Sequence, residues 1–416
     1  MSHASQSIPV VSTIFGLTYL ALAIGKVPGL RTDRAGIAMI GAVAMLAGGV
    51  VSMRDAARSV DYETIVLLFG MMVVVAHLQL AGFFSLVTDR IAAHFSRPLA
   101  LLAVIISLSG ILSAFLVNDV VCVALTPLVL RLCERLRRNP IPYLVGLATA
   151  SNVGSVATIT GNPQNIIIGS LSQISYLRFA ARLTPVAAMG LLLDFAVVAL
   201  VYRKSLFARR PSPPSIPDEN EPRIRIHRGL MIKSILVTLT TVALFFAGQP
   251  IALVALVAAA ILMLDRIRPR KVFDSVDWPL LVMFSGLFVV VHAFETNVVR
   301  TWNLERQQTL LNSPVVLVSG LSVLLSNLVS NVPAVLLFKP LMEVMPQKEQ
   351  AWLALAMSST LAGNLTVLGS VANLIVVESA RRSGTELSFL EYLKVGIPLT
   401  LLTLLVGIAW LTFTYY

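Results

Sequence analysis

Residues 151–170 read SNVGSVATITGNPQNIIIGS, and residues 359–379 read STLAGNLTVLGSVANLIVVES. Both segments are apolar and long enough to cross a membrane, and both contain the pattern Thr-x-x-Gly-x-x-x-Asn near their middle. Polar groups cost free energy in hydrocarbon unless they meet partners or line a wet cavity. Two such matched interruptions, half a chain apart, are typical of the binding site of a transporter built from inverted repeats.

The composition excludes an ordinary soluble protein. Of the 416 residues, 56% are hydrophobic and only 13% are charged, whereas a soluble domain carries about 25% charged residues. Apolar runs long enough to cross a ~30 Å hydrocarbon core recur along the whole length, so we predict an all-α polytopic membrane protein. The net charge of +11 is assigned to basic loops rather than to nucleic-acid binding.

A segment rich in proline and charge divides the chain. Residues 204–228 read KSLFARRPSPPSIPDENEPRIRIHR, which predicts a cytoplasmic linker between a first repeat, residues 1–203, and a second repeat, residues 229–416. The two halves share three motifs in the same order, which indicates an internal duplication. The matched residues are Ser59-Val60-Asp61 and Gly70 with Ser275-Val276-Asp277 and Gly286, Ser113 and Asn118 with Ser326 and Asn331, and the two Thr-Gly-Asn patterns.

Each half is predicted to contain three spans, a re-entrant helical hairpin, a broken span and a final span. The expected spans of the first half are 8–27, 35–53 and 62–82, with the hairpin at 99–134, the broken span at 141–175 and the final span at 182–203. Those of the second half are 229–248, 250–266 and 278–296, with the hairpin at 313–344, the broken span at 350–379 and the final span at 390–415.

The hairpins determine whether the two halves have opposite orientations in the membrane. If each hairpin enters and leaves on one side, each half crosses the membrane five times and the two repeats are inverted. The basic clusters at 135–138, 204–228, 266–271 and 381–382 then share one side, which the positive-inside rule makes the cytoplasm. We therefore expect a multi-pass protein of the cell inner (plasma) membrane with both termini outside.

The broken spans and the hairpin tips supply the candidate site. A helix that restarts at the membrane midplane presents unpaired N–H groups, and glycine lets the backbone leave helical geometry. Re-entrant tips are tolerated only where protein or water satisfies them, so they should face the same cavity. The alternative is that these groups cap each other and touch no substrate. The predicted substrate-binding residues are Ser113, Asn118, Thr158, Gly161, Asn162, Asn165, Ser326, Asn331, Thr366, Gly369, Ser370 and Asn373.

Asp119 is the candidate for coupling to an ion. It is an acid inside an apolar hairpin, and its counterpart in the second repeat is Val332, so symmetry does not require it. Intramembrane acids are costly and by default functional. A protonated carboxyl suits a proton carrier and an ionised one suits a sodium ligand, while permanent pairing with a nearby donor is the structural alternative.

No enzyme motif is present in the apolar segments. The chain lacks His-Glu-x-x-His, Gly-x-Ser-x-Gly and paired catalytic carboxylates, so we expect no catalytic residue and no cofactor. Cys122 and Cys133 match no metal spacing and are expected to be buried thiols, and no metal site is predicted.

Four segments together resemble a known family. They are SAFLVNDVVCVALTPLVL from Ser113, SNVGSVATITGNPQNIIIGS, SNLVSNVPAVLLFKPLM from Ser326 and LAGNLTVLGSVANLIVVES. This order resembles the ion transporter superfamily, and within it the branch of arsenite/antimonite permeases and the melanosomal P protein. The resemblance implies an elevator mechanism and a homodimer, in which the hairpins and broken spans form a transport domain that moves against a scaffold.

The hairpin tips of this chain differ from those of some members of this superfamily. Relatives that move dicarboxylates with sodium have Ser-Asn-Thr at both hairpin tips, whereas this chain has Val117-Asn118-Asp119 and Ser330-Asn331-Val332. We therefore expect proton-coupled efflux of arsenite, antimonite or a related small hydroxide or oxyanion, with H⁺ carried by Asp119. A sodium-coupled anion symporter of the dicarboxylate type and a sodium/proton antiporter are the alternatives. The expected partners are the small inorganic anion or metalloid substrate, the lipid bilayer and a second copy of the chain, with a separate ATPase subunit left open and nucleic acid excluded.

Overall fold

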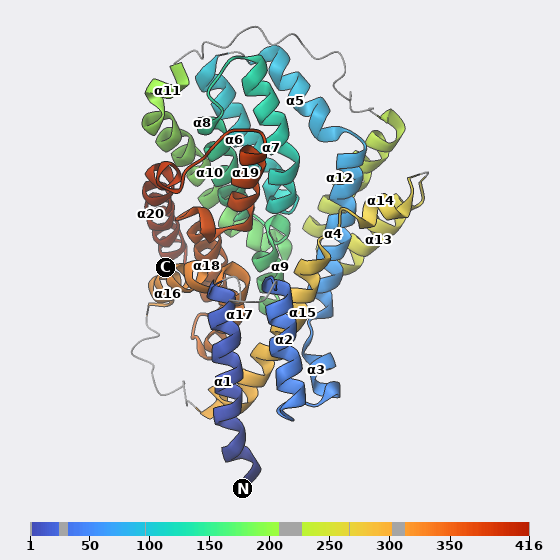
Figure 1. Ribbon diagram of the computed structural model, residues 1–416, viewed down its shortest axis with the longest axis vertical. Coiled ribbons are helices and arrows are strands. Elements are labelled where there is room, and N and C mark those ends of the chain that lie inside the picture. Colours follow the sequence, from blue (N-terminus) through green and yellow to red (C-terminus); the bar gives the residue numbers. More distant parts are fainter. Residues whose placement is uncertain are drawn as a thin grey trace.

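The computed structural model describes residues 2–24, 32–95, 97–207, 227–265, 267–301 and 313–415, and within these ranges it contains helices and no strand (Figure 1). The first half forms α1 (Ser2–Ile24), α2 (Arg34–Ala47), α3 (Met53–Ser59), α4 (Tyr62–Leu80), α5 (Phe83–His94), α6 (Pro98–Phe115), α7 (Asn118–Arg135), α8 (Ile141–Ser155), η1 (Ile159–Gly161), α9 (Pro163–Ser172), α10 (Tyr176–Val201) and α11 (Arg203–Phe207). The second half forms α12 (Arg228–Phe246), α13 (Ile251–Met263), α14 (Pro269–Phe273), α15 (Trp278–Asn297), η2 (Val299–Thr301), α16 (Pro314–Val329), α17 (Asn331–Val344), α18 (Lys348–Ala362), η5 (Val367–Gly369), α19 (Val371–Arg382) and α20 (Phe389–Phe413).

Several of these helices are built to cross a membrane. In the described part of the chain, α4, α6, α10, α12, α15 and α20 are long and apolar enough to span, and shorter apolar helices occur in α1, α2, α13 and α16. Large apolar side chains on these helices lie exposed on the outside of the protein, among them Leu192, Leu200, Leu239, Leu401 and Leu405. A soluble protein rarely exposes so much apolar surface, so this surface faces lipid and the prediction of a polytopic α-helical membrane protein is confirmed.

Both predicted broken spans are broken in the structure. The 15 residues of α8 and the 10 residues of α9 correspond to roughly 22 Å and 15 Å of helix, so neither alone crosses a ~30 Å core. The 3₁₀ turn η1 separates them, and η5 separates α18 from α19 in the same way. The interruptions thus place backbone ends in the interior of the protein, as the repeated pattern predicted.

Both hairpins are also present. α6 and α7 meet at Leu116 and Val117, and α16 and α17 meet at Ser330, whose φ of 79° makes the tight reversal. A positive φ is uncommon outside glycine and marks a sharp turn. The tips contact the broken helices: α7 packs on α8 and α19, and α17 packs on α18 and α9.

A separate group of helices packs through close symmetric crossings. α2 packs on α15 and α4 packs on α13, so each pair joins one helix from each half. A Cβ added to Gly286 on α15 would lie 2.7 Å from the backbone oxygen of Ala38, and one added to Gly70 on α4 would lie 2.7 Å from the backbone carbon of Ala255. The matched glycines of the two halves therefore allow two helix crossings at backbone contact, which is a packing role.

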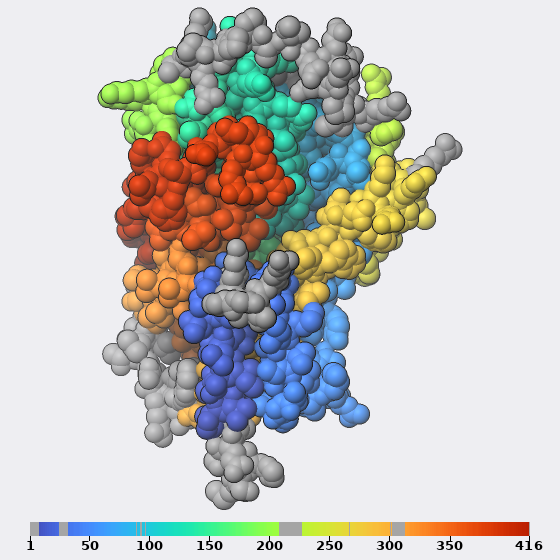
Figure 2. Space-filling model, viewed as in Figure 1, coloured from blue at the N-terminus to red at the C-terminus, as the bar shows by residue number. Residues whose placement is uncertain are grey.

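The remaining helices form the body that holds the breaks. α6 packs on α8, α16 on α18, and the two long final helices α10 and α20 pack on each other. In Figure 1 the helices α6, α7, α8, α10, α18, α19 and α20 gather in the upper and left parts of the molecule, whereas α4, α12 and α13 lie to the right. Figure 2 shows the arm formed by α13 and α14, in yellow, projecting from this body.

Two features differ from or lie beyond the expectation. The short helices α3 (Met53–Ser59), α5 (Phe83–His94) and α14 (Pro269–Phe273), which lie between predicted elements, were not predicted. Residues 208–226 of the predicted linker lie outside the described residues, and its first residues, 204–207, belong to α11.

Candidate functional site

The first break is held by the residues of its own pattern. The side-chain nitrogen of Asn165 donates to the backbone oxygens of Ser155 and Thr158, at 3.0 Å each, and the side chain of Asn162 accepts from the backbone N–H of Asn165 at 2.8 Å. A Cβ on Gly161 would lie 2.2 Å from the oxygen of Ser155. The asparagines thus satisfy free ends of both half-helices, and the glycine permits their close approach.

The second break repeats this geometry. The side-chain nitrogen of Asn373 donates to the backbone oxygens of Gly363 and Thr366, at 2.7 and 3.2 Å. Ser370 caps the first turn of α19, and a Cβ on Gly369 would lie 2.9 Å from the oxygen of Gly363. The equivalence confirms that the two segments are structural repeats. It also means that the amide nitrogens of the two pattern asparagines are occupied by the fold.

A buried asparagine that the sequence analysis missed joins the two repeats. The nitrogen of Asn152 on α8 donates to the side-chain oxygens of Asn364 at 2.8 Å and Asn373 at 3.1 Å. Its oxygen accepts from the nitrogen of Asn118 at 3.0 Å and from the hydroxyl of Ser370 at 3.0 Å. Asn152 therefore connects the first hairpin tip to the break of the second repeat.

Thr360 has the symmetric role. It lies 208 residues after Asn152, the same offset that separates the two patterns, and its hydroxyl accepts from the side-chain nitrogens of Asn162 at 3.1 Å and Gln164 at 3.3 Å. The same hydroxyl donates to the oxygen of Asn165 at 3.4 Å. Each break is thus bonded to the helix that precedes the other break. The constant offset was the signal in the sequence that could have identified both residues.

The first hairpin tip is bonded to the first broken span. Ser113 donates to the hydroxyl of Ser151 at 3.2 Å, and Ser151 donates to the backbone oxygen of Asn118 at 3.3 Å. Thr158 donates to the backbone oxygen of Ala114. Three predicted site residues are therefore brought together here, at the level of the break.

The second hairpin tip lies beside the second break, and several of its polar side-chain atoms have no hydrogen-bond partner among the described residues. The side-chain nitrogen of Asn331 lies 3.3 Å from the position of a Cβ on Gly363, and the oxygen of Asn327 lies 3.1 Å from that of a Cβ on Gly369. In the described part of the chain, the side-chain oxygens of Ser326, Asn327 and Asn331 are buried and have no hydrogen-bond partner. Buried acceptors without a partner are costly, so a ligand that donates hydrogen bonds is the expected partner.

Asp119 lies next to this cluster. It is half-buried in the first turn of α7 and directly follows Asn118. Its carboxyl faces the backbone N–H of Ala372 in the first turn of α19, where the helix dipole favours negative charge. None of the ion pairs among the described residues includes it. Asp119 thus stands between a hairpin tip and a helix start without a fixed cation.

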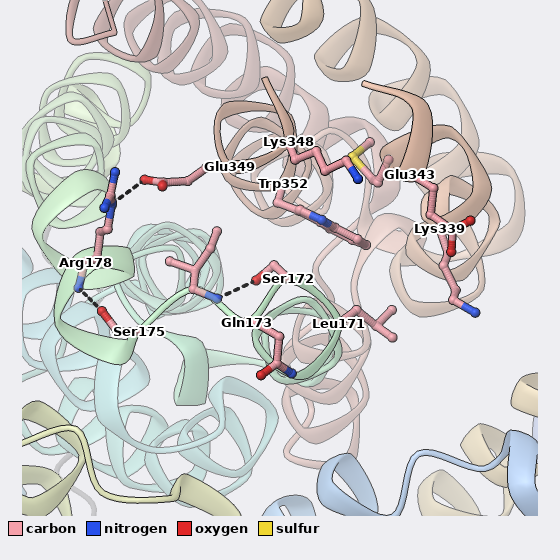
Figure 3. Close-up of a pocket in the computed structure, with 12 residues that line it drawn as sticks. Leu171, Ser172, Gln173, Ser175, Arg178, Lys339, Glu343, Lys348, Glu349 and Trp352 are labelled. Carbon is pink, nitrogen blue, oxygen red and sulfur yellow. Dashed lines mark hydrogen bonds and ion pairs between the residues drawn. The ribbon is translucent and has the colours of Figure 1, made fainter. Parts of the chain in front are cut away.

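A separate pocket lies away from the predicted site residues. A cavity of about 570 Å³ opens where α9 and α17 end and α18 begins, and Figure 3 shows Arg178, Lys339 and Lys348 around it. Arg178 pairs with Glu349 at 2.7 Å, and Lys339 pairs with Glu295 on α15 at 2.9 Å. None of the predicted site residues lines this pocket. Its charges are largely paired within the fold. We therefore assign the candidate site to the asparagine cluster at the two breaks and the first hairpin tip, formed by Asn118, Asn152, Asn162, Asn165, Asn364 and Asn373.

The central position of Asn152 makes a testable prediction. Asn152→Ala removes the partner of four hydrogen bonds and leaves several buried polar groups unpaired, which should lower the free energy of unfolding by about 3 kcal/mol and weaken substrate binding. Thermal unfolding in detergent measures the change. Asn139→Ala is the control, since Asn139 lies at the start of α8 and bonds the side chain of Ser205 outside the cluster. Equal melting temperatures for the two variants would contradict a central role for Asn152.

Comparison with known proteins places the chain among transporters. Residues 19–362 match the family model CitMHS, described as citrate transporter. The silicon efflux transporter LSI3 of Oryza sativa subsp. japonica is 31% identical, over 97% of this chain and 98% of that protein. The P protein of Mus musculus is 26% identical over 90% of this chain, which corresponds to 57% of its own length. Among solved structures, the YdaH transporter of Alcanivorax borkumensis shares the fold with a TM-score of 0.59 at 16% identity, over 99% of this chain and 97% of that one.

Proposed function

Because this chain belongs to the CitMHS citrate transporter family of membrane transporters, we propose that it is a secondary active transporter that exports arsenite, antimonite or a related small hydroxide in exchange for protons. Family membership makes the protein a transporter rather than an enzyme. The similarity to a silicon efflux transporter supports the same chemical class, because silicic acid is a small uncharged hydroxide.

The unpartnered oxygens of the site carry the proposal. The amide oxygens of Asn118, Asn327 and Asn331 are buried without a partner around the second break, in the described part of the chain. Arsenous and antimonous acids are uncharged hydroxides near neutral pH, and their O–H groups donate to such oxygens. A citrate ion carries three carboxylates and a single hydroxyl donor at that pH, so most of its oxygens accept hydrogen bonds and it needs cationic partners. The hydrogen bonds of Asn152 include no lysine, arginine or histidine, whereas Arg34 on α2 donates to the hydroxyl of Ser330 at the second tip, at 3.4 Å.

The two groups of helices support a moving transport domain. The hairpins and broken helices are tied to each other by side-chain bonds across the repeats, while α2, α4, α13 and α15 form the separate symmetric crossings. We propose that the first group moves as one body against the second, in a homodimer in the plasma membrane with both termini outside. Rigid-body motion of this kind is a common form of alternating access.

A sodium-coupled carboxylate symporter of the same fold is the second candidate, and a sodium/proton antiporter is a third within the same architecture. The starts of α9 and α19, capped by Asn162 and Ser370, both lie at the cluster, and helix N-termini favour anions. The description of the matching family also names citrate. In either of these cases Asp119 becomes a cation ligand.

Flux in proteoliposomes tests the proposal. We expect arsenite or antimonite to move under an imposed proton gradient alone, with a rate that saturates with substrate and is unchanged by sodium. Protein-free vesicles prepared in parallel give the leak of the small neutral hydroxides across the bilayer. Uptake of citrate or a dicarboxylate that requires a sodium gradient would overturn the proposal in favour of the symporter.

A further inference from the structure

Asp194 is a second acid inside the membrane-embedded body. It lies within α10 and is 0% exposed. One carboxylate oxygen, Oδ1, lies 2.8 Å from the hydroxyl of Thr149 on α8, whose single proton it shares with the backbone oxygen of Val145, also at 2.8 Å. The other, Oδ2, has no partner among the described residues. An ionised carboxylate with a single hydroxyl partner is very costly in such a place, so this group requires a proton or a cation.

Among the described residues, no cation is paired with Asp194. α10 packs on α6, α8, η1, α11, α12, α18 and α20, and Thr149 is the one hydrogen-bond partner of the Asp194 carboxyl in the described part of the chain. The titratable groups in this corner are Tyr392 on α20, Cys122 on α7 and Tyr202 at the C-cap of α10. All three are neutral when protonated. The hydroxyl of Tyr392 is itself buried without a hydrogen-bond partner of normal geometry.

The repeat symmetry shows that the fold does not need an acid here. The helix-capping Ser175 and Ser388, and the internal Pro185 and Pro398, match at an offset of 213 residues, which pairs Asp194 with Gly407. At the offset of the broken spans, 208 residues, the counterpart of Thr149 is Met357. A Cβ on Gly407 would lie 2.1 Å from the sulfur of Met357, so these counterparts also touch. Where the second repeat packs methionine on glycine, the first repeat places a hydroxyl against a carboxyl.

Hydrogen bonds connect Asp194 to the candidate site. The backbone oxygen of Thr149 accepts from the side-chain nitrogen of Asn364 at 3.1 Å, and the oxygen of Asn364 accepts from Asn152 at 2.8 Å. Asn152 in turn accepts from Asn118, the residue that precedes Asp119. A change of charge at Asp194 alters its hydrogen bond with Thr149. The hydrogen bonds of Asn364 and Asn152, which follow along this path, are expected to change with it.

We propose that Asp194 is a second proton-binding site of this protein, linked through Thr149 and Asn364 to the asparagine cluster. The carboxylate takes one proton from a hydronium ion of the aqueous phase, whose O–H bond breaks to leave water, while an O–H bond forms at Oδ2 and the carboxyl becomes neutral. Release breaks the same bond and returns the proton to water. The use of this site in exchange for substrate rests on the proposed function, whereas the binding of the proton does not.

Infrared difference spectroscopy of the purified full chain tests the binding directly. We expect the wild type at neutral pH to show the C=O stretching band of a protonated carboxyl, and Asp194→Asn to lose it. Asp119→Asn should keep the band, which separates the two acids. Asp194→Ser, uncharged and smaller, should give the same loss as Asp194→Asn. An unchanged spectrum in both Asp194 variants overturns the proposal, and so does a band that sodium alone removes at constant pH, because the site would then hold Na⁺.

The coupling between Asp194 and the candidate site is tested by a second measurement, the pH dependence of substrate affinity. The affinity for arsenite should change about tenfold with pH in the wild type, and this change should be lost in Asp194→Asn, as for two sites coupled by a modest free energy. Thr149→Val keeps the carboxyl but removes its hydroxyl partner, so it should retain a shifted infrared band and lose the pH dependence of binding. A wild-type pH dependence in Thr149→Val would overturn the proposed path. If no arsenite binds at all, the proposed substrate fails while the infrared result still decides the assignment of Asp194.

Discussion

Asp119→Asn is expected to abolish proton-driven transport while the protein remains folded. The carboxyl lies in the first turn of α7, between the hairpin tip and the start of α19, and it is in no ion pair among the described residues. Asparagine has nearly the same shape and carries no charge. It cannot bind and release a proton in the working range of pH. The driven flux should therefore fall by at least about tenfold, to the rate seen without a gradient.

The measurement is flux with and without an imposed proton gradient, in vesicles that contain equal amounts of protein. Asp274→Asn is the matched control, since Asp274 is an exposed acid at the end of α14. Its flux and its proton dependence should equal those of the wild type. Normal acceleration by the gradient in Asp119→Asn would remove Asp119 from the coupling mechanism and leave Asp194 as the acid to test.

Gly161→Ala is expected to cause the largest loss of stability among the single changes considered. The added methyl group would lie 2.2 Å from the backbone oxygen of Ser155. That oxygen is held by Asn165, and the atom in the way is backbone rather than the end of a flexible side chain. The two halves of the broken span would have to separate. The cost should reach roughly 3 kcal/mol or more, at the upper end of overpacking effects.

Thermal unfolding and the yield of monodisperse protein in detergent check this prediction. Gly369→Ala meets the equivalent oxygen at 2.9 Å and should be milder. Gly320→Ala is the neutral control because it is exposed within α16 and has nothing within 4 Å, so alanine there should change stability by less than about 1 kcal/mol and in the favourable direction. If Gly161→Ala melts like Gly320→Ala, the close contact between the half-helices does not exist.

The repeated patterns predicted the central architecture because their information is local. Gly161, Asn162 and Pro163 contain the requirements for ending one helix and starting another, namely close approach, a cap and a fixed φ. The hairpin residues Asn118 and Asn331 occur at equal spacing in both halves, so their equivalence was readable without coordinates. Their roles in binding a substrate stay predictions. The side-chain nitrogens of the pattern asparagines Asn165 and Asn373 donate hydrogen bonds to backbone oxygens at the breaks, so their observed role is to stabilise the breaks.

The sequence by itself determined the membrane class, the internal duplication, the broken spans and the hairpins, because apolar length, capping residues and repeat spacing act over one or two helices. Only the tertiary structure decided which polar groups meet. Asn152 bonds to Asn364 and Asn373 across more than 200 residues, and Asp194 meets Thr149 from another helix. Such contacts depend on how helices from both repeats pack, and a partner that lies far away in the chain leaves no periodic signal near the residue it satisfies.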